Sequence, residues 1–229
     1  MLTSRNDEEI KQAVTRELRW DSRVEETEVG VTVHRGVVAL TGTISSYGKK
    51  VAAQEAAHRV SGVLDVANDL QVKAPGGFGR TDTEIAQAVR RTLEWDVLVP
   101  EARIQSTVSD GWVTLEGNVD NLSQRDDAER AVRYLIGVQG VHNKLAVLEQ
   151  EMDADEVRGV IEEALERRAD REAERIKVTV ANGSVTLAGD VRSWAEKRAI
   201  LGAVSHAPGV RVVHDHLRIE PYYLAVAAN

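Results

Sequence analysis

The amino-acid sequence predicts an α+β protein made of three tandem α-β-β-α-β modules, each a three-stranded mixed sheet with two helices on one face. Three observations support this prediction. A glycine-bounded hairpin signature occurs three times, a capped amphipathic helix precedes each copy, and a second helix and a strand follow each copy. Shifting the sequence by 75 residues aligns the first copy with the second, and a further 72 residues aligns the second with the third.

Each module begins with a helix. A capping box, in which a cap residue is followed three positions later by Glu, opens all three copies. The boxes are Asn6 with Glu9, Thr81 with Glu84, and Asp153 with Glu156. Apolar residues then recur at i, i+3, i+4 and i+8, as Ile10, Ala13, Val14 and Leu18 do in the first copy. This spacing indicates a helix with one buried face.

The hairpin signature is Gly-x-Val-x-Leu-x-Gly. Its copies span residues 36–42, 111–117 and 183–189. The first glycine follows Arg35, Asp110 or Asn182, and Asp-Gly and Asn-Gly favour type I′ turns because both central residues need positive φ. The alternating apolar residues predict a strand with one buried face. We expect the closing glycine to leave room for the helix that follows it.

The second half of each module is a small-residue helix and a final strand. Helix caps are predicted at Ser46, Asn121 and Ser193, the last completing a capping box with Glu196. Because two helices with one apolar stripe each can cover only one face of a three-stranded sheet, the other face must be solvated, packed against a neighbouring module or used for binding. The order of the strands stays open.

These patterns divide the chain into domains. We place repeat 1 at residues 3–74, repeat 2 at 80–148 and repeat 3 at 152–220, with a Gly-rich linker at 75–79 and a C-terminal tail at 221–229. The linker composition favours a flexible joint, so repeat 1 is expected to swing relative to repeats 2 and 3.

The repeated unit resembles the BON domain family. The resemblance rests on the hairpin signature, on the segments 62–70 and 137–145, and on the pairs Trp20-Asp21 and Trp95-Asp96 that close the first helices. It covers nearly the whole chain. Repeat 3 departs most, with Arg167 where the other repeats have tryptophan. The resemblance implies a non-enzymatic module without a cofactor, associated with osmotic stress and envelope maintenance, for which phospholipid binding has been proposed.

The charge of the chain narrows the classes of partner. The formal net charge is -8, and every repeat has more acidic than basic side chains. A nucleic-acid-binding protein normally carries a basic face, so we expect no nucleic-acid partner. Electrostatic attraction alone to an anionic bilayer is disfavoured for the same reason.

The compartment is predicted from what the sequence lacks. The absence of cysteine excludes disulfides but leaves the redox compartment open. The sequence also has no apolar segment typical of a signal peptide and no 18-residue apolar run that would span a membrane. We therefore expect a cytoplasmic protein without a transmembrane segment. Its oligomeric state is left open.

The tryptophans are the best candidates for a binding surface. Trp20 and Trp95 end the first helices of repeats 1 and 2, Trp112 is predicted on the outer sheet face, and Trp194 begins a helix of repeat 3. Leu98 lies in an apolar loop after Trp95. These side chains either complete the core of their own repeat or contact a partner. The partner would be an anionic phospholipid surface or, in the alternative, a protein bound by several repeats at once.

Catalytic and metal sites are less well supported. His214 and His216 are predicted to point to the outer face of one strand, which gives two metal ligands where a structural or catalytic zinc site needs three or four. The acidic pairs 126–127 and 162–163 lie on helix surfaces without a paired nucleophile. We therefore predict no enzymatic activity and no metal.

Overall fold

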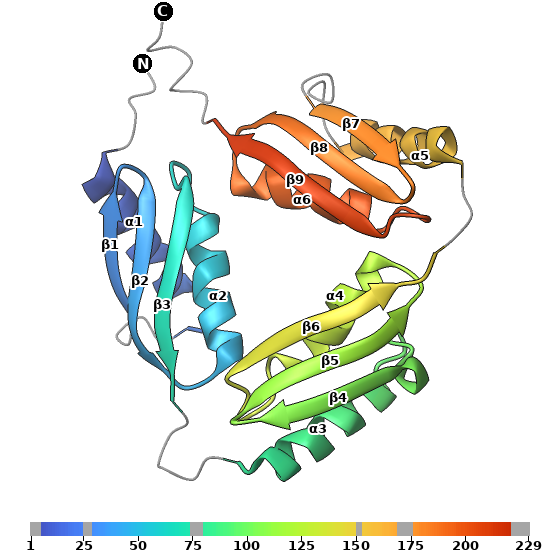
Figure 1. Ribbon diagram of the computed structural model, residues 1–229. Coiled ribbons are helices and arrows are strands. Elements are labelled where there is room, and N and C mark those ends of the chain that lie inside the picture. The colour runs from blue at the N-terminus through green and yellow to red at the C-terminus, as the bar shows by residue number, and fades with distance from the viewer. Residues whose placement is uncertain (1–5, 25–28, 74–79, 150–152, 169–175, 221–229) are drawn as a thin grey trace, which may run out of the picture.

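The computed structural model describes residues 6–24, 29–73, 80–149, 153–168 and 176–220, except for the side chains of 165–168. The expected linker at 75–79 and tail at 221–229 lie outside these ranges. Each repeat has the predicted α-β-β-α-β order and its own sheet (Figure 1).

The elements occupy equivalent places in the three repeats. Repeat 1 contains α1 (Asp7–Trp20), β1 (Val29–His34), β2 (Val37–Ile44), α2 (Tyr47–His58) and β3 (Asp65–Val72). Repeat 2 contains α3 (Asp82–Trp95), the short 3-10 helix η3 (Glu101–Arg103), β4 (Ile104–Ser109), β5 (Trp112–Val119), α4 (Leu122–Val132) and β6 (Gly140–Val147). Repeat 3 contains α5 (Ala154–Arg168), β7 (Ile176–Ala181), β8 (Ser184–Val191), α6 (Trp194–Ser205) and β9 (Val212–Ile219).

Side-chain caps define where most of the helices begin. The capping boxes of α1 and α3 form as predicted from Asn6 and Thr81, each with a Glu at the third helical position. In repeat 3 the predicted box differs, because the Asp153 carboxylate accepts from the N–H of Asp155 at 2.8 Å. The caps of α2, α4 and α6 are Ser46, Asn121 and Ser193. Glu196 accepts from the N–H of Arg192 instead of completing a box with Ser193.

The strand that carries the hairpin signature lies in the middle of each sheet. β2 pairs antiparallel with β1 and parallel with β3, and repeats 2 and 3 have the same order. A parallel pair needs a crossover connection, which α2, α4 and α6 supply. This order, which the sequence left open, makes every sheet mixed, as predicted.

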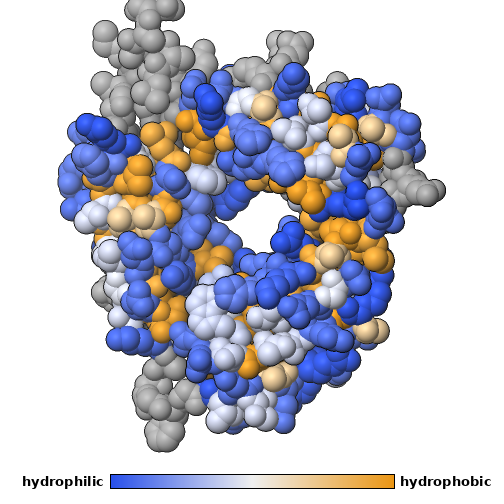
Figure 2. Space-filling model, viewed as in Figure 1, coloured by the Kyte–Doolittle hydropathy of each residue, from blue (hydrophilic) through white to orange (hydrophobic). Residues whose placement is uncertain are grey.

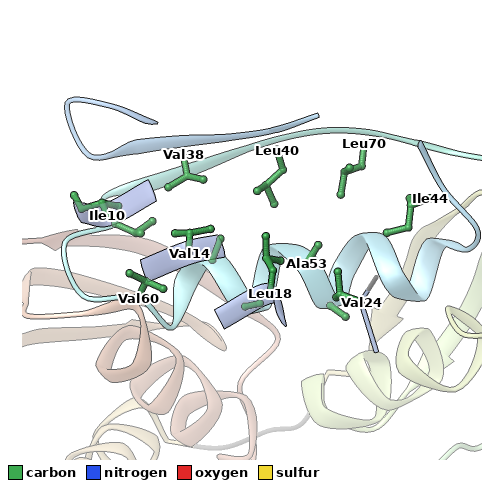
Figure 3. Close-up of a cluster of buried hydrophobic side chains, with 14 residues drawn as sticks. Ile10, Val14, Leu18, Val24, Val38, Leu40, Ile44, Ala53, Val60 and Leu70 are labelled. Atoms are coloured by element: carbon green, nitrogen blue, oxygen red, sulfur yellow. The ribbon is translucent and has the colours of Figure 1, made fainter. Parts of the chain in front are cut away.

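Each repeat buries its own core between one face of the sheet and its two helices. In repeat 1, Figure 3 shows Ile10, Val14 and Leu18 of α1 packed toward Val38 and Leu40 of β2. The alanines of α2 fill the remaining space, since small side chains let the helix approach the sheet closely. The outer face of each sheet stays solvated, with Thr32, Thr107 and Thr179 exposed.

The hairpin turns have the predicted positive φ angles at both central residues. The values are 50° and 76° at Arg35-Gly36, 51° and 76° at Asp110-Gly111, and 47° and 71° at Asn182-Gly183. Arg35 adopts this conformation although arginine is not a favoured turn residue.

A carboxylate on the first helix supports two of these turns. Asp7 accepts from the N–H groups of Gly36 and Arg35 at 3.0 and 2.8 Å, and these bonds lower the pKa of its carboxyl below the ordinary value. Asp82 accepts from Asp110 and Gly111 in the same way, at 2.8 and 2.9 Å. Repeat 3 has alanine, residue 154, at the equivalent position.

We expect Asp82→Ala to destabilise repeat 2 by about 1–2 kcal/mol, because two backbone donors lose an ionised acceptor. Urea unfolding followed by tryptophan fluorescence measures this loss. Thr83→Ala, at the next and exposed position of α3, is the matched control and should stay within about 0.5 kcal/mol of the unsubstituted protein. Equal stabilities for the two variants would contradict the role given to Asp82.

The closing glycine of the signature has a different role from the one expected. A Cβ at Gly117 would lie 2.1 Å from the carbonyl oxygen of Arg103 and 3.3 Å from Cα of Ile104, at a φ of 128°. These atoms come before and at the start of β4, the neighbouring antiparallel strand. The glycine therefore makes room for the start of β4 and not for the helix that follows.

The three repeats form a ring around a central opening, visible in Figures 1 and 2. The first residue of each second helix packs on a neighbouring repeat. Tyr47 of α2 packs on the core of repeat 2, Leu122 of α4 belongs to the core of repeat 3, and Trp194 of α6 stacks on His58 of repeat 1. The same contact made three times in one rotational sense closes the ring, as in cyclic oligomers with heterologous interfaces.

Repeat 1 therefore contacts both other repeats, which differs from the expectation that it would swing. Glu55 pairs with Arg133 of repeat 2 at 3.3 Å, and the indole N–H of Trp194 donates to the carbonyl of Leu64 at 3.2 Å. The contacts of the second helices set the orientation of repeat 1, whatever the composition of the linker.

Candidate functional site

The candidate site lies where α3 ends and the chain turns toward β4. Trp95 is the last residue of α3, and Asp96 follows as its C-cap. The Asp96 carboxylate accepts from the N–H of Leu98 at 3.0 Å, and its carbonyl accepts from the N–H of Val99 at 3.1 Å. This tight turn, which Asp favours, fixes the backbone that carries the apolar side chains.

The turn separates one buried apolar side chain from three exposed ones. Val99 is 4% exposed and belongs to the core of repeat 2. Trp95, Val97 and Leu98 are 85%, 96% and 57% exposed. Val99 therefore completes the core of repeat 2, whereas Trp95 and Leu98 face solvent and are available to a partner. Contiguous exposed apolar side chains of this size often mark an interaction surface.

A shallow groove of about 750 Å³ runs along these residues. Its walls come from the last two turns of α3 and from the following loop. The lining residues are Ala88, Arg91, Thr92, Trp95, Asp96, Val97 and Leu98. The groove thus combines apolar side chains with the guanidinium of Arg91, a combination that suits a ligand with an anionic head and an apolar body.

Arg91 precedes Trp95 by one helical turn, so the two side chains emerge on the same face of α3. Arg91 is exposed and donates to the carbonyl of Gln87 at 3.3 Å. The neighbouring Arg90 is paired with Glu94 at 2.8 Å. Arg91 was not among the site residues predicted from the sequence. The repeated Arg-x-x-x-Trp spacing at residues 16–20 and 91–95 is the signal that would have found it.

Repeat 1 presents half of this arrangement. Trp20 is 84% exposed at the end of α1, and Arg16 precedes it by one turn on an exposed face. The apolar loop is missing, because Ser22 and Arg23 replace the valine and leucine of repeat 2. Arg23 bonds Asp21 at 2.8 Å, which holds the pKa of that carboxyl well below its ordinary value, and it also pairs with Glu55 at 3.0 Å.

Trp112 lies far from this groove. It begins β5 at the end of the sheet next to the hairpin turn, whereas Trp95 lies at the opposite end, where β4 starts. Trp112 is 44% exposed on the outer face of the sheet and stacks on His142, with ring centroids 4.8 Å apart. The structure therefore does not join Trp112 to Trp95 and Leu98 in one site.

Trp194 is engaged inside the protein. Its ring stacks on His58 at 3.9 Å between centroids, and its N–H is bonded to the carbonyl of Leu64. Lys197 of the same helix lies 5.4 Å from the ring centroid. Trp194 joins repeats 3 and 1, so we do not include it in the candidate partner surface.

His214 and His216, the weak candidates for a metal site, gain no third metal ligand among the described residues. His214 and His216 are exposed on β9, while Asp215 between them points to the helix side and pairs with Lys197 at 2.8 Å. No group of three or more His, Asp or Glu side chains able to hold a metal ion occurs among the described residues.

Comparison with known proteins agrees with the repeat pattern. The family model of the BON domain matches residues 6–74, 81–149 and 153–221. Osmotically-inducible protein Y of Escherichia coli (strain K12) is 30% identical over 127 residues, or 53% of this chain and 63% of that protein. The match thus spans less than two thirds of the relative's length.

Two solved structures of CdsD, a structural protein of the Type III secretion system of Chlamydia trachomatis, cover most of this chain, and the second is its C-terminal domain. The first covers 95% of this chain and 95% of its own, at 14% identity and a TM-score of 0.28. The second covers 92% of this chain and 96% of its own, at 13% identity and a TM-score of 0.27. Among the described residues, no helix has the length and apolar character needed to cross a bilayer.

Proposed function

The chain belongs to the BON domain family, and from this premise we propose that it is a non-enzymatic, stress-related protein that binds anionic phospholipid surfaces through the groove of repeat 2. The name of its relative, an osmotically inducible protein, supports the link to osmotic stress. The lipid role is supported by one observation above all, the exposed apolar turn beside Arg91.

The chemistry of the groove suits the boundary between lipid headgroups and acyl chains. Tryptophan favours this boundary because its ring is apolar and its N–H stays hydrated. Leu98 and Val97 add apolar surface that water now covers. The Arg91 guanidinium would pair with a lipid phosphate, for which its planar set of donors is suited.

The net charge of -8 opposes binding to an anionic surface, so the apolar contacts must supply most of the affinity. Repulsion from distant acidic groups is screened over about 10 Å at 0.1 M salt. We therefore expect binding to persist, or to strengthen, between low and moderate salt. A purely electrostatic attachment would weaken under the same change.

The test is co-sedimentation of the full chain with phosphatidylglycerol-rich vesicles and with purely phosphatidylcholine vesicles. We expect binding to the first, and a loss of about tenfold or more in affinity for Trp95→Ala and for Leu98→Ala, because each removes apolar area that the bilayer would bury. The melting temperature of both variants should be unchanged, since the side chains are exposed in the free protein.

Trp112→Ala is the matched control, because it removes an exposed tryptophan from the outer sheet face of the same repeat. If this variant loses as much affinity as Trp95→Ala, the groove is not the binding site. If the unsubstituted chain stays in the supernatant with both vesicles, the lipid role is wrong, and a protein partner bound by several repeats becomes the leading function.

A further inference from the structure

The two Arg–Trp pairs at the ends of α1 and α3 are equivalent in sequence and in exposure. The pairs are Arg16 with Trp20 and Arg91 with Trp95, and the tryptophans are 84% and 85% exposed. In each pair one helical turn separates arginine from tryptophan, so both side chains share an outward face. Repeat 3 has Arg167 in place of the tryptophan, so the chain carries two such pairs.

The closed ring determines how these pairs lie relative to each other. The contacts of Tyr47, Leu122 and Trp194 relate the repeats by successive rotations about an axis through the central opening. Such a rotation leaves the height of every residue along the axis unchanged. Trp20 and Trp95 end equivalent helices of repeats 1 and 2 and therefore lie at a similar height along this axis.

The relation between repeats 1 and 2 depends on a close fit at one glycine. Gly48 of α2 faces the ring of Tyr134, and a Cβ at Gly48 would lie 2.1 Å from that ring. The hydroxyl of Tyr134 accepts from Arg133 and Arg23 at 3.1 and 3.5 Å, and Glu55 pairs with both arginines. This cluster fixes the orientation of repeat 1 relative to repeat 2, and with it the position of one Arg–Trp pair relative to the other.

We propose that the ring is a bivalent membrane-binding device, in which Arg16–Trp20 and Arg91–Trp95 engage the same anionic bilayer at the same time. This rests on the proposed function, because it uses the groove of repeat 2 as the stronger of the two contacts. A bilayer suits the arrangement, since an extended flat surface can contact exposed groups on two repeats at once, whereas a small ligand in one groove cannot. The arginines supply the charge complementarity.

Two linked contacts should bind the bilayer much more tightly than either contact alone. Once the groove of repeat 2 is bound, the pair in repeat 1 meets the same surface at a high effective concentration, and linked weak sites commonly gain about 10²–10⁴-fold in avidity. Repeat 1 lacks the apolar loop, so its pair alone should bind too weakly to retain the protein on vesicles.

The experiment compares variants of the full chain on phosphatidylglycerol-rich vesicles. We expect Trp20→Ala to weaken binding by about tenfold or more although the groove of repeat 2 is intact. Gly48→Leu should weaken it similarly, because the leucine side chain cannot fit against Tyr134 and separates repeats 1 and 2. Small-angle scattering should show the wider particle. Trp112→Ala, on the outer sheet face, should bind normally.

The outcomes separate this inference from the proposed function. If the unsubstituted chain does not bind, both fail. If Trp95→Ala abolishes binding while Trp20→Ala binds normally, the groove function stands and bivalence is wrong. If Gly48→Leu opens the ring and still binds with full affinity, the ring is not needed to align the two pairs, which also overturns the inference.

Discussion

Gly117→Ala is expected to destabilise repeat 2 by more than about 3 kcal/mol. The added Cβ would meet the carbonyl oxygen of Arg103 at 2.1 Å, and this atom belongs to the backbone, which cannot rotate away as a side chain can. The φ of 128° lies in a region that only glycine adopts without strain. Ile104, directly paired with Gly117 in the sheet, would have to move.

Gly159→Ala is the matched control for this substitution. Gly159 lies inside α5, and a Cβ there would have no atom within 4 Å. Alanine should stabilise the helix by about 0.5–1 kcal/mol, because glycine loses more backbone entropy on folding. Chemical unfolding followed by fluorescence and circular dichroism compares the two variants. If the free energy of unfolding of Gly117→Ala stays within about 1 kcal/mol of that of the unsubstituted protein, Gly117 is not needed to make room for the Arg103 carbonyl.

Lowering the pH from 7 to 4 is expected to weaken the contact between repeats 1 and 3. Burial against Trp194, followed by the charge of Arg198, lowers the pKa of His58 to about 4, although Asp65 and Glu55 act in the opposite direction. The His58 Nε2 atom is buried without a hydrogen-bond partner. Protonation would therefore place a positive charge where no acceptor receives it.

The sign of the effect follows from the two pKa values. A histidine released from the contact has an ordinary pKa of about 6.5. Between pH 6.5 and 4, His58 binds a proton when repeats 1 and 3 are apart but not when they are in contact. The free energy that favours the contact therefore falls by up to about 1.4 kcal/mol per pH unit and by about 3 kcal/mol in total. The contribution of His58 is fully present above pH 6.5 and disappears as the pH falls toward 4.

His58→Phe separates this effect from the titration of carboxylates in the same range. Phenylalanine keeps an aromatic ring on Trp194 and has no titrating group. Small-angle scattering and the intrinsic tryptophan fluorescence, to which Trp194 contributes, should report ring opening in the unsubstituted protein at acid pH and a smaller change in the variant. If both proteins open over the same pH range, His58 does not control the contact.

The fold of each repeat could be predicted because its determinants are local. Helix caps, hairpin turns and alternating strands depend on residues within a few positions of each other. Asn6, Thr81 and the Asp110-Gly111 turn behave as their local sequence predicts. Strand order could not be derived, because a parallel pair joins residues across an entire helix.

The candidate site could be predicted in part. The sequence singled out Trp95 and Leu98 but left open whether they complete the core of repeat 2 or contact a partner, and the structure leaves both side chains exposed. Trp112 lies on the predicted outer face of the sheet but at the opposite end from Trp95, a separation that residue type alone does not reveal. Arg91 was overlooked because its one sequence signal, the Arg-x-x-x-Trp spacing shared with residues 16–20, gains meaning only once both tryptophans are known to be exposed.

The sequence by itself determined three BON domains and the elements within each of them. Only the tertiary structure decided that they form a ring, that Trp194 packs on another repeat to close it, and that Trp20 and Trp95 remain exposed. The physical reason is that hydrophobic periodicity records burial within a repeat, whereas contacts between repeats depend on a few matched shapes such as Gly48 against Tyr134. No local pattern distinguishes a tryptophan that stacks on another repeat from one left free to bind.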